Sequence, residues 1–243
     1  MKIKVDKDLL IDSLQLISNV VERRQTLPVL SNLRLVVKEE TLEMVGTDLE
    51  IELHALVKVS SESPGEITVP ARKMNDIWRS LPSGQPILME QVGDKVKIKS
   101  GGSSFTLSTI PASEFPEGLG EANDRTIQID GSDFRKAVEE VAFAMAQQDV
   151  RYYLNGMLWE LSDTTFRVVA TDGHRLALTR QVLPSGASQM PSIILPRKAV
   201  GELRKLIDDH DGEVSVGLSE TRAEFGFGAV RLTSKLIDGT FPD

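Results

Sequence analysis

Residues 45–48 read Val45-Gly46-Thr47-Asp48, and residues 169–172 return to the same pattern as Val169-Ala170-Thr171-Asp172. Asp48 and Asp172 are 124 residues apart, and further landmark pairs keep the same order: 3–6 with 127–130, 67–70 with 193–196, and 115–116 with 241–242. Ordered self-similarity is the signature of a duplicated structural unit. The sequence therefore predicts two similar domains, at 1–116 and 125–243, joined by the glycine- and acid-rich linker 117–124.

Within each repeat, the hydrophobic pattern predicts a β-α-β-β-β unit that occurs twice. Apolar residues at helical spacing predict a helix in each repeat, with Leu9, Leu10, Leu14, Ile17 and Val21 in the first and Phe134, Val138, Val141 and Met145 in the second. The expected elements of the first repeat are strands at 2–5, 29–37, 41–47, 49–59, 66–69, 86–92, 95–99 and 103–109, and helices at 7–21 and 71–80. The predicted class is α+β, with both helices of a repeat covering one face of antiparallel sheets.

Composition narrows the class of protein. The absence of cysteine excludes disulfides, thiolate metal sites and cysteine nucleophiles. Residues 1–6 alternate polar with apolar residues and have no continuous hydrophobic stretch that would suit a signal peptide or a membrane span. We therefore expect a cytoplasmic protein without a membrane partner. The net charge of −8 argues against a protein that coats DNA by bulk electrostatics.

The predicted second helix of each repeat is locally basic although the chain is acidic. Its cations are Arg72, Lys73 and Arg79 in the first repeat, and Arg197, Lys198, Arg204 and Lys205 in the second. Long cations on a helix that faces a duplex contact phosphates without reading the base sequence. The alternative is a solvated helix face, which explains most single Lys or Arg residues. Recurrence in both repeats favours contact with nucleic acid.

Several stretches, in order along the whole chain, resemble the β subunit of bacterial DNA polymerase III, the sliding-clamp family. They include Gln148-Asp149-Val150-Arg151-Tyr152-Tyr153-Leu154-Asn155-Gly156-Met157, Ala170-Thr171-Asp172-Gly173-His174-Arg175-Leu176-Ala177 and Asp238-Gly239-Thr240-Phe241-Pro242-Asp243, together with 26–33, 46–50 and 69–73. Blocks of this length are far more specific than a short motif. One departure is Gln25, where several relatives have proline.

The resemblance implies the DNA-clamp fold, in which each domain is the duplicated unit with two helices packed on antiparallel sheets. It also implies a homodimeric ring of two head-to-tail chains, each with three similar domains, whose helices line a central hole around duplex DNA. Such a ring confers processivity on the replicative polymerase by enclosure, so it needs little binding free energy. The third domain is absent from this chain, and we expect no ring closure by the usual contact.

The resemblance also implies roles for individual positions. DNA contacts are implied at Arg24, Arg72, Gln148, Arg151, Tyr152, Tyr153, Arg197 and Lys198, and a groove for partner peptides at Leu154, Thr171, Gly173, His174, Arg175, Leu176 and Pro242. The contact between chains is implied at Lys73, Phe105 and Leu107, although Phe105 and Leu107 also fit a strand core. The implied partners are double-stranded DNA, the polymerase III catalytic subunit, the clamp loader, and other replication and repair proteins with clamp-binding peptides.

Two rival interpretations remain open. A duplicated α/β enzyme would use Asp48, Asp172 and His174 as acid–base or metal groups. The sequence offers three histidines and no glycine-rich phosphate loop or nucleophile motif beside them, so a turn-forming role for the Thr-Asp pairs fits better. We predict no catalysis, no metal and no cofactor. The second rival is an interaction scaffold that never encloses DNA, which would not need basic helices on a common face.

Overall fold

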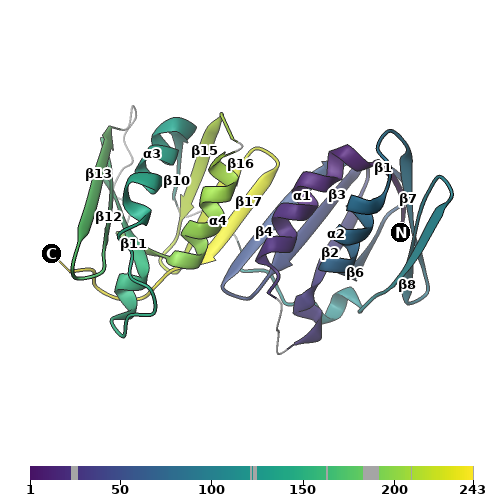
Figure 1. The fold of residues 1–243 in the computed structure, drawn as a ribbon, viewed down its shortest axis with the longest axis horizontal. Coiled ribbons are helices and arrows are strands. Elements are labelled where there is room, and N and C mark those ends of the chain that lie inside the picture. Colours follow the sequence, from purple (N-terminus) through teal and green to yellow (C-terminus); the bar gives the residue numbers. More distant parts are fainter. Residues whose placement is uncertain are drawn as a thin grey trace. The chain divides into compact units, whose positions relative to one another are not determined.

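The chain separates into two compact units, Met1–Gly118 (unit 1) and Leu119–Asp243 (unit 2). The structure is a computed structural model that describes residues 1–22, 27–120, 122, 125–162, 164–182, 192–208 and 210–242. No helix in these ranges is long and apolar enough to cross a membrane. Figure 1 labels the helices and most of the strands of each unit.

Unit 1 holds two helices and two antiparallel sheets in its described residues. Its elements are β1 (Lys2–Asp6), α1 (Lys7–Val20), η1 (Pro28–Ser31), β2 (Asn32–Lys38), β3 (Thr41–Thr47), β4 (Ile51–Lys58), β5 (Ser60–Ser63), β6 (Gly65–Pro70), α2 (Ala71–Ser80), β7 (Pro86–Val92), β8 (Lys95–Ser100), β9 (Ser103–Ser108) and η2 (Ala112–Glu114). One sheet has the order β5-β1-β7-β8-β9, and the other runs β4-β3-β2-β6.

Unit 2 repeats this plan. Its elements are β10 (Arg125–Asp130), α3 (Gly131–Ala142), η3 (Tyr152–Asn155), β11 (Gly156–Ser162), β12 (Thr165–Thr171), β13 (Leu176–Val182), β14 (Ile193–Pro196), α4 (Arg197–Asp208), β15 (Glu213–Leu218), β16 (Arg222–Phe227) and β17 (Val230–Lys235). The sheet β13-β12-β11-β14 corresponds to β4-β3-β2-β6 of unit 1. The strands β10-β15-β16-β17 correspond to β1-β7-β8-β9.

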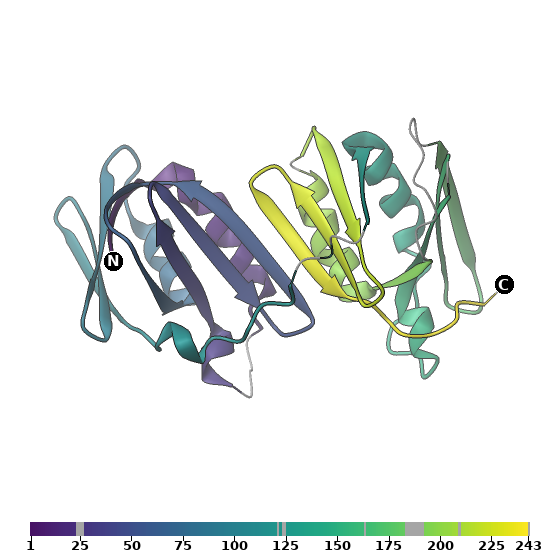
Figure 2. The ribbon, with the colours of Figure 1, turned by 180° about the vertical axis from the view of Figure 1, so that it is seen from behind.

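The helices of each unit pack against each other and against one face of the strands, α1 with α2 and α3 with α4 (Figure 1). The opposite face of the strands is turned to the viewer in Figure 2. Beneath the helices of unit 2, the ring of Trp159 lies 5.5 Å from that of Phe134 and 5.0 Å from that of Phe166, in edge contacts that stabilise a buried aromatic core. The predicted α+β class is confirmed, and so is the packing of both helices of each repeat on one face of its strands.

Some predicted boundaries and faces are wrong in detail. Leu9 was expected on the apolar face of α1, but its side chain is 58% exposed, because the face that packs against the strands is formed by Leu10, Leu14 and Ile17. α3 ends at Ala142, so the buried Met145 lies beyond the helix. β2 begins at Asn32 rather than 29, because Pro28 opens a 3₁₀ turn before it.

Candidate functional site

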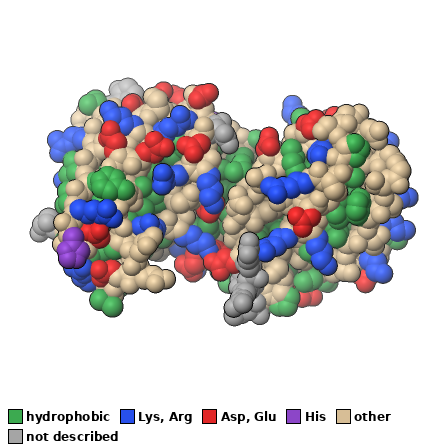
Figure 3. Space-filling view, viewed as in Figure 1, with side chains coloured by type: hydrophobic (Ala, Val, Ile, Leu, Met, Phe, Trp, Pro, Cys, Tyr) green, Lys and Arg blue, Asp and Glu red, His purple; other side chains and the backbone are tan. Residues whose placement is uncertain are grey.

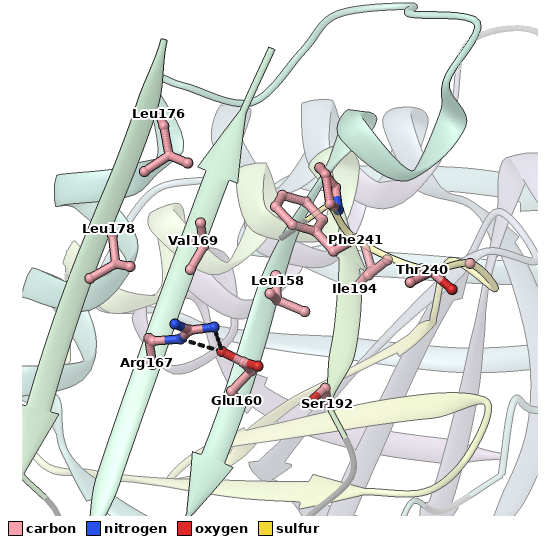
Figure 4. Close-up of a pocket in the computed structure, with 12 residues that line it drawn as sticks. Leu158, Glu160, Arg167, Val169, Leu176, Leu178, Ser192, Ile194, Thr240 and Phe241 are labelled. Atoms are coloured by element: carbon pink, nitrogen blue, oxygen red, sulfur yellow. Dashed lines mark hydrogen bonds and ion pairs between the residues drawn. The ribbon is translucent and has the colours of Figure 1, made fainter. Parts of the chain in front are cut away.

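A cavity of about 350 Å³ lies on the face of sheet β13-β12-β11-β14 that is turned away from the helices (Figure 4). We call it the unit 2 groove. All four strands of the sheet and the segment after β17 form its wall, through Leu158, Glu160, Arg167, Val169, Leu176, Leu178, Ser192, Ile194, Gly239, Thr240, Phe241 and Pro242. Most of these residues are apolar, which suits the binding of apolar side chains of a ligand.

Strand register explains why these residues share one face. Val169 pairs with Leu178 across β12 and β13, and with Leu158 across β11 and β12. Ile194 pairs with Leu158 from β14, so one apolar row crosses the whole sheet. Side chains directly opposite on neighbouring strands point to the same side of a sheet. Leu176 and Leu178 are 62% and 49% exposed, so this row ends in an open apolar surface.

The floor of the unit 2 groove is a buried cluster of Ala146, Leu154, Val169, Ile194 and Phe241. A backbone hydrogen bond of 2.9 Å from the Ile237 amide to the Ile194 carbonyl holds the segment after β17 against β14. That bond positions the Phe241 ring over the sheet, where Figure 4 shows it beside Ile194 and Leu158. Predicted groove residue Leu154 therefore supports the groove from below, whereas Leu176 and Pro242 line it.

The other predicted groove residues form the turn before β13. The buried Thr171 hydroxyl donates to the Arg175 carbonyl at 2.7 Å and accepts from the Gly173 amide at 3.1 Å. Gly173 has φ +86°, a left-handed conformation that glycine adopts without steric cost. Backbone hydrogen bonds from His174 and Arg175 lower the pKa of Asp172. His174 is exposed on this turn, so the turn fixes where Leu176 enters the sheet.

Asp48 and Asp172, the aspartates that an enzyme would use as acid–base or metal groups, accept hydrogen bonds from backbone amides. Asp172 Oδ1 accepts from the amides of His174 and Arg175, both at 3.0 Å. Asp48 Oδ1 accepts in the same way from Glu50 and Ile51, at 2.9 and 2.8 Å. The predicted turn-forming role of the Thr-Asp pairs is therefore confirmed. Within the described residues, no group of three or more His, Asp or Glu side chains is arranged to hold a metal ion.

Two arginines predicted at different sites lie close to this turn. The Arg175 guanidinium donates to Asp172 at 3.0 Å and lies 5.6 Å from the centre of the exposed Phe143 ring. Arg151 forms a two-pronged pair with Asp149, with Nε–Oδ1 and Nη2–Oδ2 distances of 3.0 and 2.8 Å. Hydrogen bonds from Arg151 lower the pKa of Asp149 to about 2.

Arg151 also packs against the turn of the unit 2 groove. A Cβ atom added to Gly173 would lie 3.0 Å from Arg151 Nη2. The prediction assigned Arg151 to DNA contact, but its guanidinium lies against Gly173, a predicted groove residue. The sequence carries no sign of this contact, because Gly173 lies 22 positions after Arg151, with β11 and β12 between them.

The remaining predicted DNA-contact residues lie on helices or on the loop before β11. Arg72 and Lys198 are exposed in the first turns of α2 and α4, whereas Arg197 is half-buried and donates to the carbonyls of Met145 and Ala146 at 2.9 and 3.4 Å. Gln148 is exposed with φ +55°, and the Tyr152 and Tyr153 rings meet edge to face at 5.9 Å. Arg24 lies outside the described residues. On each helical face, Lys and Arg are interspersed with Asp and Glu (Figure 3).

The residues predicted to join two chains lie at one end of unit 1. β9, which carries Phe105 and Leu107, is the terminal strand in the sheet order β5-β1-β7-β8-β9. Leu107 is buried, as a core strand residue would be, and Phe105 is half-buried. Lys73 is exposed on α2, which packs against β9. Their role in joining chains stays a prediction.

Sequence reasoning missed much of the wall of the unit 2 groove. Leu158, Val169, Leu178, Ile194 and Phe241 were not assigned to it, although they provide most of its apolar surface. Part of the signal was available, because Leu176 and Leu178 alternate on one strand and therefore share a face. The contribution of Phe241 needed the fold, which brings the segment after β17 back across β14.

Comparisons with known proteins agree along the whole chain. Residues 1–119 match the family model of the DNA polymerase III beta subunit, N-terminal domain, and residues 128–243 match that of its central domain. The beta sliding clamp of Pseudomonas putida is 47% identical over the entire chain, which spans 66% of the length of that relative.

Solved structures give the same result. A sliding clamp from Pseudomonas aeruginosa bound to griselimycin has a TM-score of 0.95 and 46% identity, and this chain covers 66% of it. The pol III beta of Caulobacter crescentus has a TM-score of 0.95 and 36% identity. All of this chain and 68% of that one are aligned. The chain belongs to the DNA polymerase III beta subunit family, the beta sliding clamps.

Proposed function

We propose that this chain forms the N-terminal and central domains of a ring-shaped clamp that encircles duplex DNA. In this role it keeps the replicative polymerase on its template and has no catalytic activity of its own. The unit 2 groove is the single observation that carries the proposal, because it gives a member of the clamp family a formed apolar docking site. The clamp would act on the chromosome in the cytoplasm, where replication takes place.

Enclosure explains how a protein with a negative net charge can stay on DNA. A ring retains the duplex by topology, so the contacts between helices and phosphates can stay weak and independent of base sequence. The exposed cations of α2 and α4, including Arg72, Arg79, Lys198 and Arg204, supply such contacts locally although the net charge is −8. Two copies of the longer protein would close head to tail, with Lys73, Phe105 and Leu107 at the contact.

Docking would occur at the unit 2 groove. Its partners would be the polymerase III catalytic subunit, the clamp loader, and replication and repair proteins that carry short apolar peptides. The exposed Leu176 and Leu178 offer apolar area to such a peptide, and burying a leucine contributes about 2 kcal/mol. The rigid turn at Gly173 and the packed floor around Phe241 limit the ordering cost of binding.

A calorimetric titration with griselimycin tests the docking site, since a Pseudomonas aeruginosa clamp is bound to this molecule. We expect griselimycin to bind the wild-type chain and the Leu176→Glu variant to lose at least about tenfold in affinity, because a carboxylate replaces exposed apolar area in the groove. Leu56→Glu is the matched control, because Leu56 is similarly exposed on β4 of unit 1. Equal affinity of wild type and Leu176→Glu would remove the groove from the proposal.

Retention on circular DNA tests enclosure. This chain would be joined to the part of the Pseudomonas aeruginosa clamp that it does not cover, and the chimera would be loaded onto nicked circular DNA by a clamp loader. We expect the chimera to stay on the circle through gel filtration and to leave after the DNA is linearised. Retention that is the same on circular and linear DNA would contradict enclosure and support binding by affinity.

A further inference from the structure

A charged row lies directly beside the apolar row of the unit 2 groove. Arg167 pairs with Glu160 across β11 and β12, and with Arg180 across β12 and β13. Each of these residues is two positions from Leu158, Val169 or Leu178 along its strand, so both rows share one face of the sheet. Glu160 and Arg167 line the groove themselves (Figure 4).

The charges in this row do not balance. Glu160 forms an ion pair with Arg167, which is drawn in Figure 4, so the row contains one carboxylate and two guanidinium groups. Within the part of the chain that the structure describes, no acidic side chain pairs with Arg180. Like charges directly opposite on neighbouring strands destabilise a sheet. Because Glu160 already pairs with Arg167, the row keeps one positive charge, at Arg180, that an added anion would neutralise.

The surface around the two arginines is hollowed and rich in hydroxyl groups. A second cavity, of about 460 Å³, is lined by Glu160, Leu161, Ser162, Thr165, Arg167, Arg180 and Ser192. It shares Glu160, Arg167 and Ser192 with the unit 2 groove, so the two hollows adjoin each other. A ligand that fills the apolar row can extend onto the guanidinium of Arg180 and the nearby hydroxyls without leaving the surface.

We propose that Arg180, with Arg167 beside it, is a carboxylate subsite that extends the unit 2 groove and selects partner peptides with an acidic side chain. The inference rests on the proposed docking function. An extended peptide advances about 7 Å every two residues, as β13 does between Leu178 and Arg180. The subsite therefore selects an acidic residue two positions from an apolar anchor. The net charge of −8 repels acidic peptides in general, so the selection is local.

Matched synthetic peptides test this subsite in the full chain. The acidic probe is Glu-Thr-Leu-Thr-Leu-Thr-Glu with blocked ends, the neutral probe has Gln for both Glu residues, and the basic probe has Lys. Each sequence reads the same in both directions, so chain polarity does not affect the result. NMR titration would measure the dissociation constants for wild type, Arg180→Gln, Arg180→Glu and the control Arg125→Gln, whose arginine is exposed on β10 of the same unit.

Wild type is expected to bind the acidic probe about fivefold tighter than the neutral one, and added salt should shrink this preference. Arg180→Gln should bind both probes equally, Arg180→Glu should prefer the basic probe, and Arg125→Gln should behave as wild type. Equal wild-type affinities for acidic and neutral probes, with griselimycin still bound, would overturn the subsite and leave the proposed groove standing. If neither the probes nor griselimycin bind, the proposed docking function and the subsite fall together.

Discussion

The same sheet face has opposite character in the two units. In unit 2, the sheet β13-β12-β11-β14 presents an open apolar row, whereas the matching face of β4-β3-β2-β6 in unit 1 presents ionic groups. Equivalent register positions show the exchange: His54 for Leu178, Glu52 for Leu176, Glu43 for Arg167 and Arg34 for Leu158. The backbone plan is shared, so side chains alone decide which copy has a groove.

Ion pairs cover the face of unit 1. His54 contacts Glu43 through Nδ1 and Glu52 through Nε2, both at 2.8 Å, and Arg34 pairs with Glu66. The imidazole of His54 occupies the strand position that Leu178 holds in the unit 2 groove. The comparison shows that the same strand plan carries ion pairs in unit 1 and an exposed apolar row in unit 2. Such a surface costs solubility unless it serves binding.

The largest expected effect comes from the two equivalent phenylalanines. Phe115→Ala and Phe241→Ala each remove a buried ring, and each should lower the free energy of unfolding of its unit by about 3 kcal/mol. Only Phe241→Ala should also weaken griselimycin binding, because Phe241 lines the unit 2 groove. Urea unfolding measures the first effect, with Trp78 reporting on unit 1 and Trp159 on unit 2 in single-tryptophan variants. Equal loss of binding in both variants would break the comparison.

The next largest effect on stability is expected from exchanging His54 and Leu178, which occupy the same register position in the two units. His54→Leu should destabilise unit 1 by about 2 kcal/mol, because Glu52, whose side chain is 4% exposed, loses its imidazole partner. The reverse change, Leu178→His, should alter the stability of unit 2 by less than about 0.5 kcal/mol, since Leu178 is half exposed. The same fluorescence-detected unfolding distinguishes them. Similar losses in both variants would mean that the ion pairs of unit 1 do not stabilise its face.

The matching turns predict a smaller pair of effects. Leu49 has φ +76° at the position that Gly173 fills with φ +86°. Gly173→Leu should destabilise unit 2 by about 1.5 kcal/mol, because a side chain in this conformation is strained and its Cβ crowds Arg151. Leu49→Gly should stabilise unit 1 by about 0.5 kcal/mol, as the relief of strain exceeds the added entropy of the unfolded chain. Thermal unfolding that shifts both variants in the same direction would contradict this account.

The smallest expected effect is the pH dependence that the low pKa of Asp149 gives to the stability of unit 2. The folded pKa of Asp149 is about 2, below the ordinary aspartate value of about 3.9, so its pairing with Arg151 favours the folded state above the ordinary value. This contribution is lost as the pH falls through about 2. NMR titration of the Asp149 carboxyl carbon should give that low midpoint in wild type and a value nearer the ordinary one in Arg151→Gln. An unshifted wild-type midpoint would show that the pair does not form.

Local sequence patterns predicted the elements well because they depend on neighbours a few residues apart. Pro70 correctly marked the start of α2 at Ala71, and the Thr-Asp repeats correctly marked two turns. The pattern failed at Leu9, where helical spacing alone could not choose between two adjacent apolar faces.

The unit 2 groove was only partly predictable. The resemblance supplied Leu176 and Pro242, but the floor needs Ile194 and Phe241, which the fold joins through the segment after β17. The excess of positive charge at Arg180 could not be predicted from the sequence either, because it depends on the strand register that places Arg180 opposite Arg167. Contacts between distant strands carry no local sequence signal.

Hydrogen exchange with and without griselimycin is the most direct test of the claim that unit 2, and not unit 1, has the docking face. The account predicts that griselimycin slows amide exchange in β12, in β13 and in residues 236–242. It predicts unchanged exchange in the equivalent β3, β4 and residues 110–116. Protection on the matching face of β4-β3-β2-β6 in unit 1, or binding that leaves both faces unprotected, would contradict it.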